Sequence, residues 1–326
     1  MLPTLALAAS LTSGVLPRDT VRGTVRTDSI VSRALGVQKR LLVYLPPSYT
    51  RAPTRRYPVA FYLHGAWGAE SDWVSLGRID RAMDSLIAAG HPEMILILPD
   101  GDDGWYTTWN ALNNTAACRA DTLRREPAAT YCVPWPKYDE YVARELVAHV
   151  DSSYRTYRQR EHRGIAGLSM GGYGAISLAF RYPDVFAAAA SHSGVLSPRY
   201  VGPSPYVPPT RYGTTVAAIR ARYAPALWAL MQPVFGRDTT AWRARDPTVQ
   251  ARHLVASKTR APALLIDVGR EDPFLEQNRA FRADLDSLGI SVRYVERPGK
   301  HDWVYWRAHV AESLTWLGGV IAAERR

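Results

Sequence analysis

The sequence lacks long hydrophobic runs. None of its apolar stretches reaches the roughly 18 to 20 uninterrupted residues that a membrane-spanning helix needs, so we expect no membrane span. Hydrophobic residues still make up 47% of the 326 residues and charged residues 21%, which are ordinary values for a globular protein with a sizeable core.

Lysine is also rare. Only Lys39, Lys137, Lys258 and Lys300 accompany the arginines, which are scattered singly along the whole chain. The net charge of +10 therefore arises without a dense basic helix or arm. A generally basic surface explains this charge better than a nucleic-acid partner, and we expect no nucleic acid.

Cysteine is almost absent: the chain has Cys118 and Cys132, both in one polar segment, and can form at most one disulfide. A bridge between them would close a short loop and restrict the unfolded chain, which would stabilise the fold by roughly 3 kcal/mol. Two free thiols in a reducing cytosol are the alternative. The disulfide is the favoured interpretation because the N-terminus resembles a secretory signal.

Residues 1–20 begin MLPTLALAASLTSG, an apolar stretch rich in small residues, with ALAAS as a cleavage site. The segment lacks the positively charged start that secretory signals carry. A plain apolar arm therefore stays open as an alternative, and a secreted or periplasmic protein is the favoured prediction.

From about residue 40 onward, short apolar runs alternate with segments of helical periodicity. Several runs are continuously apolar, as expected of strands that are buried on both faces of a parallel sheet. The predicted strands lie at 40–46, 57–65, 93–101, 163–169, 186–194, 261–269 and 291–296. The predicted helices include 76–87, 138–154, 275–288 and 303–322. This alternation predicts one α/β domain over residues 24–322, with a doubly wound, mostly parallel sheet.

Three segments depart from the simple alternation. Residues 24–46 predict one or two antiparallel edge strands that turn at Leu35-Gly36. Residues about 102–137 and 195–260 are long insertions. Loops of this length in a compact domain usually form lids or pocket walls, so we expect a lid-like insertion.

The segment GIAGLSMGGYGAISLAF, residues 164–180, places Ser169 between Gly167 and Gly171. The preceding residues read as a strand and the following ones as a helix that Pro183 ends. A serine at such a strand-turn-helix junction is the setting that the G-x-S-x-G motif requires of a nucleophile. Glycines are needed there because the turn is strained and crowded, and the hydroxyl then lies at the positive end of a helix.

A serine hydroxyl is a poor nucleophile near neutral pH and needs a base. His301 follows the last predicted strand, so it lies at the same carboxyl edge of the sheet as Ser169. His192 also follows a strand and is the rival candidate. His301 is the favoured base.

The base needs an acid to orient it. Asp272 lies in the loop after the strand 261–269 and can reach the loop of His301. Asp267 lies inside the strand, and Glu271 is less well placed. Asp272 could instead merely cap the helix that follows. The order Ser169, Asp272, His301 is nevertheless that of the α/β-hydrolase triad.

The strand ending in FYLHGAWG runs into a glycine turn that can face the serine. We expect the N–H groups of Ala66 and Met170 to form an oxyanion hole, with Trp67 as the fallback for Ala66. Trp67, Trp73 and Trp109 follow strand ends and could line a substrate pocket, although aromatic residues there are as often simple packing.

Three aspartates in PDGDDGW, Asp100, Asp102 and Asp103, raise the question of a metal. An EF-hand that began at Asp100 would need glutamate at its twelfth position, where the chain has Ala111. We therefore expect a tight polar turn, no metal and no cofactor.

Together the runs VYLPPSY, LHGAWG, LPDG, YDEYVARELVAHVDSSY, GLSMGGYGA, VGREDPF and PGKHDW resemble the putative-esterase branch of the α/β-hydrolases. That branch resembles esterase D (S-formylglutathione hydrolase), feruloyl and acetyl-xylan esterases, and bacterial mycolyltransferases. The resemblance covers roughly residues 25–320. It implies an α/β-hydrolase fold, with Ser169 as nucleophile, Asp272 as orienting acid, His301 as base, and Ala66 and Met170 as oxyanion donors.

The favoured prediction is a secreted serine esterase that acts on a small-molecule or carbohydrate-linked ester. An acyltransferase in which a sugar or lipid hydroxyl replaces water would use the same triad. A non-catalytic binding module is the third hypothesis, which is disfavoured because every triad position carries a competent residue. The motifs do not distinguish among acyl groups or alcohols.

Overall fold

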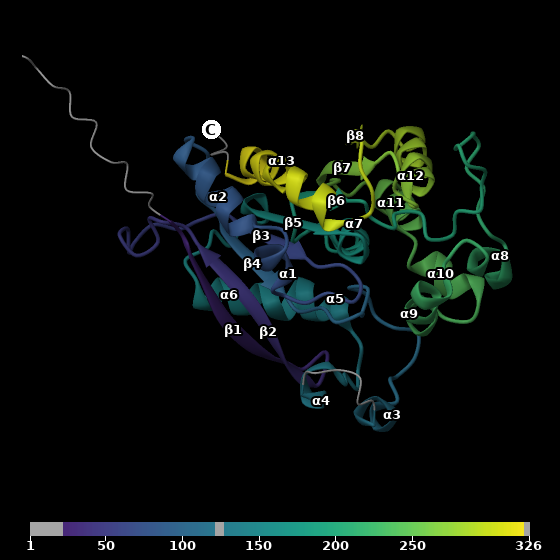
Figure 1. Ribbon diagram of the computed structural model, residues 1–326, viewed down its shortest axis with the longest axis horizontal. Coiled ribbons are helices and arrows are strands. Elements are labelled where there is room, and N and C mark those ends of the chain that lie inside the picture. The colour runs from purple at the N-terminus through teal and green to yellow at the C-terminus, as the bar shows by residue number, and fades with distance from the viewer. Residues whose placement is uncertain (1–21, 121–126, 323–326) are drawn as a thin grey trace, which may run out of the picture.

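The computed structural model describes residues 22–120 and 127–322, so the segment 1–20 lies outside the described residues. Within these ranges, eight strands form one sheet in the order β1-β2-β4-β3-β5-β6-β7-β8 (Figure 1). The strands are β1 (Thr24–Ser32), β2 (Val37–Leu45), β3 (Val59–Leu63), β4 (Ile95–Pro99), β5 (Arg163–Leu168), β6 (Ala188–His192), β7 (Ala263–Gly269) and β8 (Arg293–Arg297).

The strand pairing combines an antiparallel edge with a parallel centre. β1 and β2 form a hairpin, and β2 is antiparallel to β4. Gly36 closes the hairpin turn at φ 71°, with its N–H donating to the Ser32 carbonyl. All other neighbours run parallel. The predicted mostly parallel sheet and its antiparallel edge are therefore confirmed.

Parallel pairing determines where functional loops can meet. The carboxyl ends of β3, β5, β7 and β8 lie at the same edge of the sheet. Ser169 follows β5, Asp272 follows β7 and His301 follows β8. The fold thus brings three positions that are distant in sequence to one edge, as α/β sheets do at their ligand sites.

Helices cover both faces of the sheet. Side chains alternate along β3, so that Phe61 packs on one face and Tyr62 on the other. The face of Tyr62 is covered by α1 (Asp72–Ser75), α2 (Ile79–Ala88) and α13 (Trp303–Ile321). The face of Phe61 is covered by α5 (Tyr138–Glu140), the π-helical turn Tyr141–Leu146, α6 (Val147–Ser153), α7 (Met170–Arg181), α11 (Pro247–Ala256) and α12 (Leu275–Ser287).

The two predicted insertions are structured. The first carries α3 (Thr115–Arg119) and α4 (Ala128–Tyr131), and the predicted disulfide is present between Cys118 and Cys132, with Cα atoms 5.6 Å apart. The second carries α8 (Val216–Arg220), α9 (Pro225–Phe235), α10 (Thr239–Ala244) and α11.

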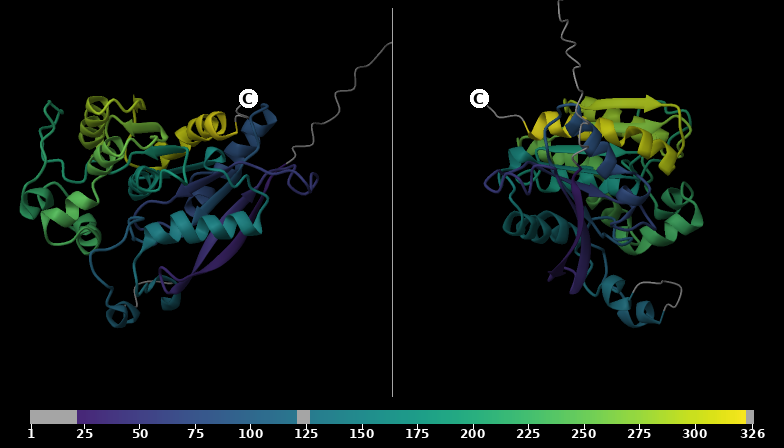
Figure 2. Two further views of the ribbon diagram at one scale, coloured as in Figure 1. Left: turned by 180° about the vertical axis from the view of Figure 1, so that it is seen from behind. Right: turned by 60° about the vertical axis from the view of Figure 1, so that its left-hand side comes forward.

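Helices α8, α9 and α10 gather in a lobe beside the sheet, on the side away from the β1–β2 hairpin (Figure 2). In the lobe Trp242 stacks on Trp228 at 5.3 Å and on Phe235 at 4.7 Å between ring centroids, and these rings continue the hydrophobic core of the domain. That this lobe acts as a lid stays a prediction. No helix in the two described ranges is both long and apolar enough to cross a membrane.

Candidate active site

Ser169 occupies a strained turn between β5 and α7. Its backbone angles are φ 51° and ψ −117°, a conformation that residues other than glycine rarely adopt. A Cβ on Gly171 would lie 2.4 Å from the Leu63 carbonyl oxygen, and one on Gly167 would lie 2.3 Å from the Gly171 oxygen. The backbone therefore requires glycine at both flanking positions, for the reason predicted from the motif.

His301 bridges Ser169 and Asp272. Its Nε2 lies 2.9 Å from Ser169 Oγ, and its Nδ1 lies 2.8 Å from Asp272 Oδ2. A carboxylate only accepts hydrogen bonds, so we assign the ring proton to Nδ1. Nε2 is then free to accept the hydroxyl proton of Ser169.

The acid and the base are both fixed by their surroundings. The Asp272 side chain is fully buried, and its second oxygen accepts the backbone N–H of Phe274 at 2.8 Å. The His301 ring lies edge to face between Phe274 and Trp306, with centroids 5.0 and 4.9 Å away. These contacts hold the imidazole in the plane that joins the serine to the aspartate.

His192, the rival candidate for the base, points elsewhere. It is completely buried, and its ring nitrogens lie 2.9 Å from Ser313 Oγ and 2.7 Å from Asp267 Oδ2. Only its backbone contacts the serine, because its carbonyl accepts the Ser169 N–H at 2.9 Å. The structure therefore brings His301, and not His192, to the serine.

The two predicted oxyanion donors are the backbone N–H groups of Met170 and Ala66, from the turns after β5 and β3. Met170 is the first residue of α7, and N–H groups in the first turn of a helix have no acceptor within the helix. Ala66 lines the same cavity as Ser169. The fallback donor, Trp67, is unsuited to the role because its N–H donates to Asp103 Oδ1 at 2.7 Å.

Hydrogen bonds join the turn after β3 to the segment that follows β4. The N–H of Gly101 donates to His64 Nε2 at 2.9 Å, and the Tyr106 hydroxyl donates to the His64 carbonyl at 3.1 Å. With the bond from Trp67 to Asp103, these contacts fix the backbone on either side of Ala66.

The predicted tight turn is present, since the Gly104 N–H donates to the Gly101 carbonyl at 3.1 Å, and the other two aspartates of this segment also form a buried ion-pair cluster that was not predicted. The ammonium group of Lys39, itself fully buried, lies 2.6 Å from Asp100 and 2.8 Å from Asp102. Burial, the larger cause, and repulsion by the Asp100 carboxylate, the second cause, raise the pKa of Asp102 to about 6. The Tyr138 hydroxyl donates a hydrogen bond to Asp102 Oδ2. The sequence did not indicate this cluster because Lys39 belongs to a distant strand.

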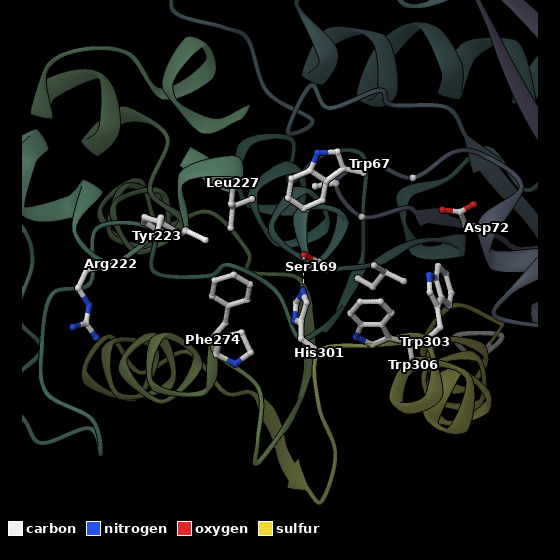
Figure 3. A pocket seen from close by; sticks show the side chains of 16 residues that line it. Trp67, Asp72, Ser169, Arg222, Tyr223, Leu227, Phe274, His301, Trp303 and Trp306 are labelled. Carbon is white, nitrogen blue, oxygen red and sulfur yellow. Dashed lines mark hydrogen bonds between the residues drawn. The ribbon is translucent and has the colours of Figure 1, made fainter. Parts of the chain in front are cut away.

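A cavity of about 460 Å³ opens around Ser169 and His301 (Figure 3). Its wall is largely apolar and aromatic, with two charged side chains, Asp72 and Arg222. It is lined by Gly65, Ala66, Trp67, Gly68, Asp72, Leu168, Ser169, Arg222, Tyr223, Ala224, Leu227, Pro273, Phe274, His301, Trp303 and Trp306.

One of the three predicted pocket tryptophans lines this cavity. Trp67 does so and is 64% exposed. Trp73 and Trp109 do not, which corrects the prediction. Trp73 is fully buried, and its indole N–H donates to the Leu63 carbonyl at 2.9 Å. Trp109 packs near Tyr138 and donates to Gly104.

Sequence reasoning missed most of the cavity wall. Phe274, Trp303 and Trp306 lie within a few residues of Asp272 or His301, so closeness to the predicted triad was a usable signal. For the wall residues from the lobe, the sequence held no signal other than their position in the insertion 195–260. They are Arg222, Tyr223, Ala224 and Leu227.

Known proteins resemble the chain over most of its length. An esterase of Mycobacterium tuberculosis is 29% identical over 281 residues, covering 82% of this chain and 53% of that protein, so the chain spans about half the length of this relative. An acetyl esterase of Caldicellulosiruptor saccharolyticus is 25% identical over 261 residues, covering 80% of this chain and 83% of that protein. A solved structure of a ferulic acid esterase superposes with a TM-score of 0.64 at 25% identity, covering 92% of this chain and 98% of that one.

The sequence model of one family, described as putative esterase, matches residues 32–317. This match covers nearly all of the sheet and the whole of the site around Ser169. The resemblance inferred from the motifs is thereby confirmed, and the chain belongs to the putative esterase family, with an α/β-hydrolase fold.

Proposed function

We propose that the chain is a serine esterase that hydrolyses carboxylic esters through an acyl-enzyme on Ser169. The observation that carries this proposal is the continuous hydrogen-bonded chain from Ser169 through His301 to Asp272, with contacts of 2.9 and 2.8 Å. It is supported by membership of the putative esterase family and by the apolar cavity that opens at the serine.

In the first half of the reaction, Ser169 Oγ attacks the ester carbonyl while His301 Nε2 takes its proton. The resulting imidazolium is stabilised by the buried Asp272 carboxylate, which remains ionised. The C–O bond to the alcohol then breaks, and His301 returns the proton to the departing oxygen. The acyl group stays on Ser169.

In the second half, water takes the place of the alcohol. His301 Nε2 accepts a proton from the water as its oxygen attacks the acyl carbonyl. The bond to Ser169 Oγ breaks, His301 reprotonates that oxygen, and the carboxylic acid is released.

Both halves pass through a tetrahedral oxyanion. The N–H groups of Ala66 and Met170 are the donors in this proposal, and the N-terminus of α7 adds a favourable dipole. Donors held in place by the fold need no reorganisation during the reaction. Each is expected to contribute about 3 kcal/mol to transition-state stabilisation.

The disulfide between Cys118 and Cys132 supports a secreted or periplasmic location in this proposal, because structural disulfides persist in oxidising compartments.

Pre-steady-state hydrolysis of a 4-nitrophenyl ester tests the proposal. An acyl-enzyme that forms faster than it breaks down releases a burst of one 4-nitrophenolate per molecule, followed by slower turnover. Ser169→Ala should abolish both phases. Hydrolysis by this variant at the wild-type rate would refute the mechanism.

A further inference from the structure

Arg222, contributed by the helical lobe, is part of the cavity wall and places a positive charge at its edge (Figure 3). It lies on the turn between α8 and α9, where its N–H donates to the Ile219 carbonyl at 3.0 Å. The next residue, Tyr223, is buried, and its hydroxyl donates to the Pro198 carbonyl at 2.7 Å. Gln277 of α12 also donates to that hydroxyl, at 3.2 Å. The turn that carries Arg222 is therefore anchored to the body of the domain.

Among the residues that the structure describes, no carboxylate pairs with the guanidinium group of Arg222. Its side chain is exposed, and it makes no ion pair within residues 22–120 and 127–322. Glu276 is the acidic residue in the first turn of α12, shortly after the wall residue Phe274 in sequence, but it has other partners. Its carboxylate accepts the N–H of Tyr206 at 2.6 Å and pairs with Arg279 at 3.3 Å. The charge of Arg222 is thus available to a ligand.

The other charged side chain of the wall, Asp72, is placed differently. It accepts the Ala69 N–H at 3.2 Å, and it lies on the opposite side of Ser169 from Arg222 (Figure 3). The cavity therefore has an acidic side and a basic side, with the nucleophile between them. An anionic group on a bound ester is repelled from the side of Asp72 and attracted to the side of Arg222.

Apolar side chains occupy the space between Ser169 and Arg222. Figure 3 shows Tyr223, Leu227 and Phe274 there, all part of the cavity wall. These side chains suit an aliphatic or aromatic spacer and offer little to a chain of hydroxyl groups.

We propose that Arg222 forms an anion subsite, and that the substrates of this esterase carry a carboxylate or similar anionic group joined to the scissile ester by an apolar spacer. The inference rests on the proposed function, because it assigns a substrate class to the same site. A guanidinium group binds a carboxylate through two parallel hydrogen bonds, which gives orientation as well as affinity.

Two pairs of esters test the subsite and identify the side of the ester that carries the charge. On the acyl side, mono(4-nitrophenyl) adipate is compared with 4-nitrophenyl hexanoate, which has a methyl group in place of the carboxylate. On the alcohol side, 4-acetoxybenzoate is compared with its methyl ester. The quantity measured is the ratio of kcat/KM for the charged ester to that for the neutral one.

In one of the two pairs, the wild-type ratio should exceed that of Arg222→Gln by about tenfold. Arg222→Lys should keep part of the preference, because it keeps the charge but loses the paired hydrogen bonds. The matched control is Arg220→Gln, which removes the same charge from an exposed position outside the cavity wall and should leave the ratio unchanged.

A ratio that is the same in wild type and Arg222→Gln for both pairs would overturn the subsite. So would an equal fall in Arg222→Gln and Arg220→Gln, since that would indicate general electrostatic attraction by a basic protein. In either case continued hydrolysis of the neutral esters would leave the esterase proposal standing. Failure to hydrolyse any of the four esters would count against both proposals.

Discussion

The backbone N–H of Trp67 donates to Asp103 Oδ1 at 2.7 Å. Trp67 itself has a φ of 59°, so this bond holds a left-handed turn directly after Ala66. The contact ties the turn after β3 to the segment after β4. In our account Asp103 is a positioning residue that keeps the Ala66 N–H in place for the oxyanion.

Asp103→Ala should therefore lower kcat about 10- to 100-fold with a smaller effect on KM, because misplacing a donor weakens mainly the transition state. Asp103→Asn keeps an oxygen acceptor and should recover most of the loss. The affinity of a boronic acid that mimics the tetrahedral intermediate should fall in parallel with kcat. If both variants bind the boronic acid as wild type does, Asp103 has no part in positioning the oxyanion donor.

Asp272→Asn should lower kcat by about 10⁴-fold while the protein stays folded, because an amide at this position no longer holds His301 in the tautomer that accepts from Ser169. Steady-state hydrolysis of a 4-nitrophenyl ester measures the effect. The matched control is Glu271→Gln, which changes the exposed neighbour and should retain wild-type activity. Wild-type activity in Asp272→Asn together with a large loss in Glu271→Gln would contradict the role of Asp272 as the orienting acid.

Gly171→Ala should destabilise the fold by at least about 2 kcal/mol and reduce activity. Its Cβ would lie 2.4 Å and 2.5 Å from two backbone oxygens, of Leu63 and His64, which cannot move without shifting β3. Urea unfolding measures the free energy of unfolding of each variant relative to wild type. Gly319→Ala is the control: its Cβ meets nothing within 4 Å in α13, so it should stabilise the protein by up to about 1 kcal/mol. Equal stability of the two variants would contradict this account of the turn.

Glu296 on β8 provides a pH-dependent test of stability. The hydrogen bond from Arg279 lowers its pKa, and both guanidinium contacts measure 2.8 Å. A carboxylate with a lowered folded-state pKa stabilises the fold above its unfolded-state pKa, and this contribution is lost as the pH falls through the folded-state pKa. Since the pair is partly exposed, we expect Glu296→Gln to be less stable by about 1 kcal/mol at pH 7.

The difference between Glu296→Gln and wild type should shrink as the pH falls below about 4, because both side chains are then neutral. Urea unfolding at a series of pH values measures it. A stability difference that grows towards low pH would have the wrong sign for this ion pair.

Local sequence patterns predicted the fold and the meeting of Ser169, His301 and Asp272, for physical reasons. Continuously apolar runs mark strands buried on both faces, and each predicted strand from β2 to β8 is present. Gly167 and Gly171 mark a turn in which a side chain at either position would collide with the backbone. His301 and Asp272 follow strands whose carboxyl ends lie at the same edge of a parallel sheet.

Features that depend on long-range packing could not be predicted in this way. Trp73 and Trp67 both follow β3, yet one is buried beneath the site and the other lines the cavity. Lys39 meets Asp102 only after β2 is in place, and Arg222 reaches the cavity only through the arrangement of the lobe. The choice between water and another hydroxyl as acyl acceptor is not encoded in the triad, because both use the same residues.

The most direct test of the central claim is labelling with a fluorophosphonate, followed by mass spectrometry of the intact protein and its peptides. The reagent forms a covalent bond only with an activated serine. We predict one adduct per chain, located on Ser169, and no adduct on Ser169→Ala. An adduct on a different serine, or an unmodified wild-type protein under conditions that label a known serine hydrolase, would contradict the account.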